Sequence, residues 1–346
     1  MEFNIFDPVS LTEALNQNLP PKRFLSKTFF GTRYYSTRQI GVDIIKGTRR
    51  IAPFVRAHQA GTAVQGQEIE TKFFEPGQIN LHIRTDAVDA FKRAAGENIS
   101  YANGEKRNPA SVFQDIVARD QQELIDSAYR TIEKMCSDAI FTGVVNMHDQ
   151  NGGLIDSIDL GLAGTHNLTL ASGSGWNEAS TDPLKDLRAW KRLVTKDSGL
   201  NATDAVFGSS AYDAFIANAS VKDYLDKSHI DLGSIAPGDI SDDGATLMGR
   251  VNGLNIWVVD DWFIDPSTGS EAPLVPEEKV AVIARNLRAN VHFGLINDVD
   301  AGNFEGELFT RIYKEPDGSA QNVQLRSAPL ATIEQINGIV VADVVV

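Results

Sequence analysis

One stretch of the sequence, residues 109–141, limits the possible folds more than any other. Apolar residues recur in it at every third or fourth position, so they form one stripe along a helix. Asn108 is a suitable N-cap for this helix, and Pro109 suits its first position. At about 1.5 Å per residue the helix spans roughly 50 Å, which is long for a globular domain and suits a structural spine. The side chains expected to face the domain core include Ile116, Leu124 and Ile132.

A polar segment interrupts a region that otherwise looks like strand. Residues 40–57 and the stretch that ends near Thr85 favour strands, whereas the segment between them contains Gly61, Gly66 and a single large apolar residue, Val64. Such a segment cannot bury enough apolar surface to order itself. We therefore expect other copies of the protein to cover this loop. The candidate contact residues in it are His58, Val64, Gln65, Gln67 and Glu68.

The beginning of the sequence is basic although the chain is acidic. Eight basic and four acidic residues give residues 1–50 a charge of +4, which leaves −18 for the rest of a chain with a net charge of −14. Two interpretations are open: a solvated tail, or an arm that lies on an acidic surface of a neighbour or touches something anionic. In the second interpretation the candidate contact residues are Lys22, Arg23 and Lys27.

The remaining sequence predicts a mixture of helices and strands, and the expected fold class is α+β. A short helix is expected over residues 86–95, and residues 143–181 are typical of a loop. Asp182-Pro183 begins a helix, and two further helices are expected to be capped by Ser209 and Ser220. Asn252-Gly253 predicts a tight turn between two strands. Strands are also expected at "KVAVIAR" and over most of the stretch from Glu305 to Val346.

Cellular location is constrained by what the sequence lacks. Cys136 is the only cysteine, which excludes a disulfide framework within one chain and favours assembly in a reducing cytosol. The acids Glu2 and Asp7 and the lack of a basic start argue against a secretory signal. The longest apolar run, "GIVVADVVV", is interrupted by Asp343 and has about half the length needed to cross a bilayer, so no membrane span is expected.

No motif for catalysis or cofactor binding stands out. None of the histidines lies three or four positions from another, so no helical metal pair is expected. The carboxylates of "DDWFID" are separated by Trp262 and Phe263, and the better interpretation is a solvated turn. "SGSGWN" lacks the ending of a phosphate-binding loop. No cofactor or metal site is therefore predicted, although an enzyme whose carboxylates meet only in the tertiary fold stays an alternative.

The order of features along the chain is similar to that of a known family. The basic arm, the polar loop and the long helix are followed by "W…DPLKDLRAW", between Trp176 and Trp190, and by the "NGLNIWVVDD" hairpin. "FGLINDVDA" comes next, and "SAPLATIEQINGIVVADV" closes the sequence. In this order the chain resembles, over nearly its whole length, the major capsid protein of phage lambda and its relatives, capsid family E.

The resemblance implies a Hong Kong 97-type capsid fold with five parts. They are an N-terminal arm at residues 1–45, a peripheral domain at 46–145, an axial domain at 146–299, peripheral strands at 300–326 and an axial C-terminal strand at 327–346. The peripheral domain would carry an extended loop near residues 54–80 and the spine helix near residues 109–141. The resemblance also implies that the arm and the loop bury nothing in their own subunit.

The function implied by the resemblance is that of a major head protein. Copies would assemble in the host cytoplasm into pentamers and hexamers of an icosahedral shell, and would end in the virion. The implied partners are a portal, a scaffold and a decoration protein, with double-stranded DNA enclosed rather than specifically bound and no membrane involved. An acidic body fits this, because it would not grip DNA. The alternatives are a nanocompartment shell protein of the same fold, a tail-tube protein, which the long helix argues against, and the enzyme mentioned above.

Overall fold

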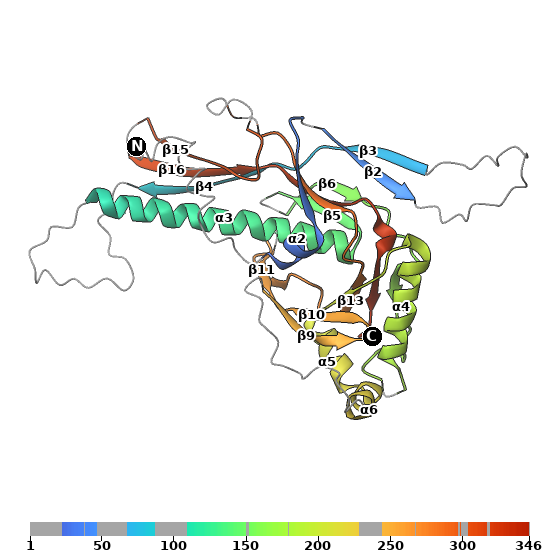
Figure 1. Ribbon diagram of the computed structural model, residues 1–346. Helices are drawn as coiled ribbons and strands as arrows, with labels where there is room; N and C mark the ends of the chain where they lie inside the picture. The colour runs from blue at the N-terminus through green and yellow to red at the C-terminus, as the bar shows by residue number, and fades with distance from the viewer. Residues whose placement is uncertain are drawn as a thin grey trace, which may run out of the picture.

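The structure is a computed structural model of the chain, and it combines helices and strands as the sequence predicts (Figure 1). The described residues are 23–37, 39–46, 68–86, 109–149, 152–178, 180–227, 244–266, 268–296, 298, 304–316 and 319–345. A long helix and an antiparallel sheet form one region, and a larger mixed sheet with shorter helices forms the other (Figure 1). Among the described residues, no helix combines the length and the apolar character needed to span a membrane.

The long helix is α3 (Pro109–Phe141), with the bounds that the sequence predicts. It packs against an antiparallel sheet of β15 (Phe309–Lys314), β16 (Ala320–Ser327) and β4 (Ile79–Asp86), in that order. Leu124 and Ile132 are buried, and Ile116 is half-buried. Helix α2 (Phe24–Phe29) and β17 (Pro329–Ile333) also contact α3, so α3 packs against more than the antiparallel sheet.

The larger sheet has the strand order β7-β18-β13-β8-β10-β9. Side chains alternate between its two faces, as they must in strands. Ala205 and Phe207 face one apolar cluster, while Val206 between them faces the cluster that contains α3. The bounds of these strands are β7 (Asn167–Thr169), β8 (Asp204–Phe207), β9 (Ala245–Val251), β10 (Leu254–Val259), β13 (Lys279–Ile283) and β18 (Ile339–Asp343).

Helices α4 (Pro183–Ser198) and α5 (Ser209–Ala217) pack on the larger sheet, and α6 (Ala219–Lys227) packs against these two helices. The Asp182 carboxylate accepts hydrogen bonds from the Leu184 and Lys185 amides, which confirms the predicted start of α4. The serine caps were wrong. The N-cap of α5 is Gly208, without a side-chain hydrogen bond, and at α6 the Asn218 side chain accepts from the Ser220 amide.

Residues 143–181 are not the loop that the composition suggests. They contain the hairpin of β5 (Val144–His148) and β6 (Leu154–Asp159), and then β7. The strand expected to run to Thr85 is also broken, because residues 75–78 separate β3 (Glu68–Phe74) from β4 and include Pro76-Gly77. The helix expected over residues 86–95 falls outside the described part of the chain, apart from Asp86, which ends β4.

The N-terminal segment lies in the body of its own subunit. Helix α2 (Phe24–Phe29) buries Phe24, Leu25 and Phe29 in the cluster that contains α3. Strand β1 (Gly31–Tyr34) pairs in parallel with β14 (Ala289–Phe293), which pairs on its other side with β17 (Pro329–Ile333). The expectation that the arm buries nothing at home is therefore wrong for residues 24–34, whose aromatic side chains and strand pairing find partners in the same chain.

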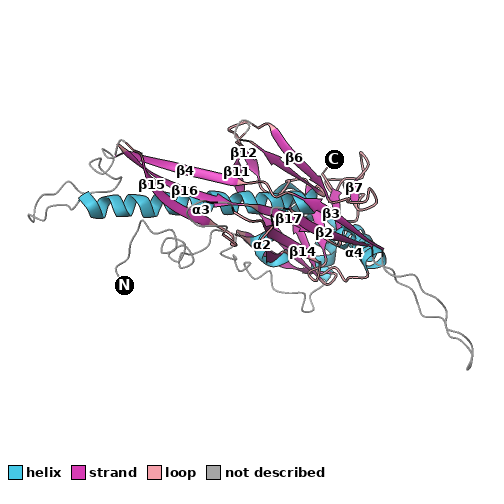
Figure 2. Cartoon of the chain, turned by 90° about the horizontal axis from the view of Figure 1, so that it is seen from above, coloured by secondary structure: helices cyan, strands magenta, loops and turns pink. Residues whose placement is uncertain are grey.

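Two ribbons complete the described structure. β2 (Ile40–Lys46) and β3 pair antiparallel and extend past the C-terminal end of α3 (Figures 1 and 2). β11 (Trp262–Ile264) and β12 (Glu271–Pro273) form the second ribbon, and a short 3-10 helix, η2 (Ile336–Gly338), precedes β18. The β2–β3 ribbon is what the sequence predicts for the flanks of the polar loop, and residues 47–67 between its strands lie outside the described residues.

Candidate functional site

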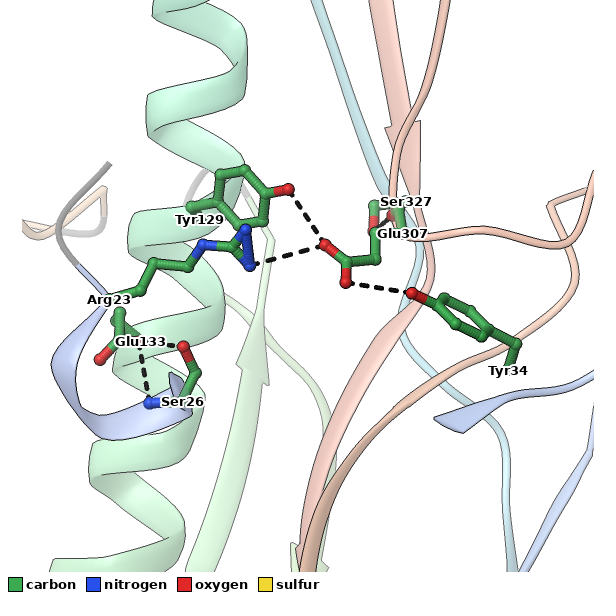
Figure 3. A network of polar contacts seen from close by, with 7 residues as sticks. All are labelled: Arg23, Ser26, Tyr34, Tyr129, Glu133, Glu307 and Ser327. Atoms are coloured by element: carbon green, nitrogen blue, oxygen red, sulfur yellow. Dashed lines mark hydrogen bonds and ion pairs between the residues drawn. The ribbon is translucent and has the colours of Figure 1, made fainter. Parts of the chain in front are cut away.

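The arm, α3 and the strand pair β15–β16 meet at a group of polar side chains that we call the arm junction (Figure 3). Its members are Arg23, Ser26, Tyr34, Tyr129, Glu133, Glu307 and Ser327. The Glu133 carboxylate on α3 accepts hydrogen bonds from the amides of Leu25 (3.0 Å) and Ser26 (2.9 Å), and from the Ser26 hydroxyl. These amides belong to the first turn of α2, whose N-cap residue, Arg23, does not cap it with its own side chain. Glu133 thus caps α2 from another helix.

The Glu307 carboxylate forms the second centre of the arm junction. It accepts hydrogen bonds from the hydroxyls of Tyr129 (3.0 Å) and Tyr34 (3.1 Å), and it lies 3.5 Å from the Arg23 guanidinium. The Arg23 guanidinium carbon also lies 3.4 Å from the centre of the Tyr129 ring, a cation–π contact. One carboxylate therefore ties two parts of the arm to the spine helix. Ser327 positions it by donating to the Glu307 carbonyl at 2.6 Å.

Burial sets the protonation behaviour of the arm junction. Burial raises the pKa of the Glu133 carboxyl above its ordinary value, against the opposite influence of the Ser26 and Leu25 donors and of Arg23. Burial, followed by the Glu307 charge, raises the pKa of the Tyr129 hydroxyl far above its ordinary value. Tyr129 therefore stays a hydrogen-bond donor to Glu307 throughout the neutral range.

Strand β1 is fixed by a second polar group beside β14. The Arg33 guanidinium lies 3.2 Å from the Glu334 carboxylate, which also accepts from the Asn290 amide at 3.1 Å. His292 is 1% exposed, and its ring nitrogens lie 2.7 Å from the Thr332 hydroxyl and 3.1 Å from the Tyr35 hydroxyl. Burial, and secondarily Arg33, lowers the pKa of His292 from 6.5 to about 4. A neutral His292 is thus part of the packing that holds β1.

Acid should therefore loosen the contact between β1 and β14. Because the pKa of His292 is lower in the folded state, the unfolded state binds the proton first, and stability should fall as the pH drops from about 6.5 to about 4. The lowered pKa corresponds to roughly 3 kcal/mol at most. Chemical unfolding of the subunit at several pH values should show this slope, and His292→Gln should reduce it. Parallel curves for the two proteins between pH 7 and 4 would contradict the assignment.

The residues predicted to contact other subunits have different positions. Arg23 contacts Glu307 and Tyr129 of its own chain in the arm junction, and its contact with another subunit stays a prediction. Lys27 lies exposed on α2. Only the backbone of Glu68, at the start of β3, is described. Lys22, His58, Val64, Gln65 and Gln67 lie outside the described residues.

Sequence reasoning did not identify Glu133, Tyr129 or Glu307. One signal was present for Glu133, since it interrupts the apolar positions Ile132 and Met135 of the predicted helix, where a charge requires a partner. Nothing in the sequence marks Glu307, whose partners lie far away along the chain.

Other buried acids also serve the packing. The Asp204 carboxylate is fully buried and accepts from Thr203, Asn255, Trp257 and Arg285. Asp298 pairs with Arg311 (3.2 Å) and Arg326 (3.0 Å), which ties the segment before β15 to the β15–β16 pair. In the described parts of the chain, no three His, Cys, Asp or Glu side chains gather as a metal site would require. These polar groups hold elements of the fold together.

Comparison with known proteins gives a consistent result. The sequence matches the family "Phage major capsid protein E" over residues 7–344. It is 22% identical over 175 residues to the P21 prophage-derived major head protein of Escherichia coli O6:H1 strain CFT073 and to the major capsid protein of enterobacteria phage P21. Each match covers 50% of this chain and 50% of the relative, so the chain spans about half the length of these curated relatives.

Solved structures resemble the fold over more of the chain. A crystal structure described as that of a prophage capsid protein from E. coli CFT073 has a TM-score of 0.71 at 17% identity, covering 98% of this chain and 99% of the other. A phage-related protein from Bordetella bronchiseptica RB50 has a TM-score of 0.59 at 10% identity, covering 98% and 97%. At these identities the likeness concerns the fold.

Proposed function

The chain belongs to the phage major capsid protein E family and has the Hong Kong 97-type fold, and on this basis we propose that copies of it build the head shell of a tailed double-stranded DNA phage or prophage. The subunits would form pentamers and hexamers of an icosahedral shell. The observation that carries the proposal is the family match, which runs over residues 7–344 and so includes both regions of the fold. Family and fold together point to a structural role rather than an enzymatic one.

The proposed division of the chain follows the two regions of the structure. The peripheral domain would contain α3 with β4, β15 and β16, and the axial domain would contain the larger sheet with α4 to α6. The separate apolar cluster between that sheet and its helices supports an axial unit. Within the proposed arm (residues 1–45), Arg23 and residues 24–34 contact the body of their own subunit.

The proposed contacts between subunits involve the β2–β3 ribbon and the loop it carries. A ribbon of two strands is marginal when it stands alone, and its Phe73 side chain is 71% exposed. Both features support a ribbon that packs on another copy. The contact residues proposed from the sequence are Lys22, Arg23, Lys27, His58, Val64, Gln65, Gln67 and Glu68.

The proposed setting is a virion whose shell is put together in the cytoplasm of the host bacterium. Portal, scaffold and decoration proteins would be the further partners, and the acidic body would enclose DNA without gripping it. A nanocompartment shell remains the second candidate because it would have the same fold. Electron micrographs of purified particles, with DNA or an enzyme cargo inside, distinguish the two.

Deleting residues 58–68 and closing the gap with a short turn should prevent shell formation while leaving the subunit folded. The deleted segment contributes one large apolar side chain, so the subunit's own core should lose little. Circular dichroism with thermal melting reports on the subunit, and electron microscopy of the assembly reaction reports on shells. An unfolded subunit would assign the loop to its own core, and full-sized stable shells would remove its role in assembly.

Charge reversal in the arm separates contacts between subunits from contacts within one. Lys22→Glu combined with Lys27→Glu should weaken assembly most at low salt, where charges are least screened, with little change in subunit stability. Arg23→Glu is the matched comparison. It should destabilise the subunit itself, since it places a carboxylate beside Glu307 and removes the cation from the Tyr129 ring. Equal assembly by the lysine variant and wild type at all salt concentrations would exclude an electrostatic role for those lysines.

A further inference from the structure

The β11–β12 ribbon has one face fixed to the spine helix. The Ser137 hydroxyl of α3 donates to the Leu274 carbonyl at 2.6 Å, directly after β12. Phe263, the middle residue of β11, packs on the apolar cluster of α3, and the Lys134 ammonium lies 5.5 Å from its ring centre. The Leu274 amide also donates to the Asp261 carbonyl. The β11–β12 ribbon is therefore held against α3 along one face (Figure 2).

The opposite face of the ribbon presents apolar side chains to solvent. Because side chains alternate along a strand, Trp262 and Ile264 point away from the side on which Phe263 packs. Trp262 is 46% exposed and Ile264 is 68% exposed. The Trp262 indole N–H donates to the Asp260 carboxylate at 3.1 Å, and the Trp262 amide donates to the Asp261 carboxylate. The large ring is thus held in a fixed orientation, as in the aromatic anchors of protein interfaces.

Acidic residues surround these apolar side chains. Residues 260–273 contain four acids and no Lys, Arg or His. The acids are Asp260, Asp261, Asp265 and Glu271. Lys134 of α3, whose ammonium lies over the Phe263 ring, is already paired with Asp138. A partner that covers this face must therefore supply apolar side chains together with positive charge.

One segment of the chain has that composition. Residues 47–67 contain Arg49, Arg50 and Arg56 and no acid, in a chain with a net charge of −14, and Ile51, Phe54 and Val55 lie among these arginines. The exposed bases of α4, such as Arg192, offer charge alone, because the apolar side chains of α4 are buried in its own domain. The strands that flank residues 47–67 extend past the C-terminal end of α3, while the β11–β12 ribbon lies against α3 (Figures 1 and 2).

We propose that the exposed face of the β11–β12 ribbon is a docking surface for residues 49–56 of a second copy of this chain. Trp262 and Ile264 would pack against Phe54 and Val55, and the acids around them would pair with the arginines. The inference rests on the proposed function, since it requires that copies assemble. It adds the partner surface on which the basic segment lies.

Cysteine cross-linking tests the contact directly. The natural Cys136 is buried, so introduced cysteines can be read alone. Subunits carrying Ile264→Cys are mixed with subunits carrying Phe54→Cys, assembled and oxidised. A disulfide-linked dimer that contains one subunit of each kind is the expected product. A second mixture pairs Ile264→Cys with Arg192→Cys on α4 and should give no such product.

The outcomes separate the contact from the proposed function. Shells without the mixed dimer would overturn the contact and leave the shell function standing. A disulfide within one chain of the Ile264→Cys/Phe54→Cys double variant at high dilution would place residues 49–56 on the β11–β12 ribbon of their own subunit. That result would contradict docking on a second copy. Failure of wild-type protein to form any large assembly would overturn the proposed function, and the contact with it.

Substitutions supply an independent measure. Trp262→Ala should raise the subunit concentration at half-assembly at least about tenfold, as expected for an aromatic anchor. Glu271→Lys and Arg50→Glu should each weaken assembly, and the two together should recover part of the loss. If the losses of the two single variants simply add in the double variant, the two charges do not interact. Unchanged melting of the unassembled variants shows that the subunit itself is intact.

Discussion

Replacing Leu124 by aspartate should lower the free energy of unfolding of the subunit by about 3–5 kcal/mol. Leu124 is 5% exposed and lies in the apolar cluster that joins α3 to the sheets around it. The substitution removes buried apolar surface and places a carboxylate among apolar side chains, which cannot pair with its charge. Urea unfolding followed by circular dichroism measures the effect. The variant should also fail to assemble, because several strands and α2 pack against α3.

Arg130→Asp is the control for this substitution. Arg130 is exposed on the same helix, so the same new side chain should cost less than about 1 kcal/mol there. A Leu124→Asp subunit that is as stable as the Arg130→Asp subunit would mean that this face of α3 is not part of the core.

Replacing Glu133 by alanine should detach α2 from the spine helix. The Leu25 and Ser26 amides and the Ser26 hydroxyl would lose their acceptor inside the protein, which should cost about 2–4 kcal/mol. Hydrogen exchange at the Leu25 and Ser26 amides should accelerate far more than exchange in the larger sheet. Denaturant unfolding gives the corresponding loss in stability.

Glu133→Gln tests whether the acceptor oxygen or the charge matters. Glutamine keeps one acceptor oxygen but turns an amino group toward the second donor, so we expect an intermediate loss. Lys134→Ala on the same turn leaves the α2 cap intact and should not change exchange at the Leu25 and Ser26 amides. Protection of both amides in Glu133→Ala would show that α2 is held by its apolar side chains alone.

Elements governed by local chemistry could be predicted from the sequence. The spacing of apolar residues and Pro109 defined α3, and Asp182 defined the start of α4. The turn at Asn252-Gly253 was predictable because its two residues adopt φ angles of 53° and 72°, which asparagine and glycine tolerate best. The β5–β6 hairpin was missed because its exposed strand alternates little and carries Asp156, Ser157 and Asp159.

The arm junction could not be predicted because its contacts join residues far apart in sequence. The Ser26 amide and its acceptor Glu133 are 107 positions apart, and Tyr34 and Glu307 are 273 apart. Composition alone suggested that an arm rich in aromatic and basic residues reaches a neighbour. The same composition equally suits an arm that folds back on its own body, and only the tertiary structure distinguishes these.

The parallel pairing of β1 with β14 has a consequence for the order in which the protein folds during synthesis. Residues 24–34 leave the ribosome long before their partners Asn290, Glu307 and Glu334 are made. Until then Phe24 and Phe29 have no complete cavity to enter. Similarly, β18 is made after β7 and β13 and must insert between them. A nascent chain therefore cannot complete its body before β18 has been made, and chains terminated earlier would expose an aromatic segment that chaperones or proteases can bind.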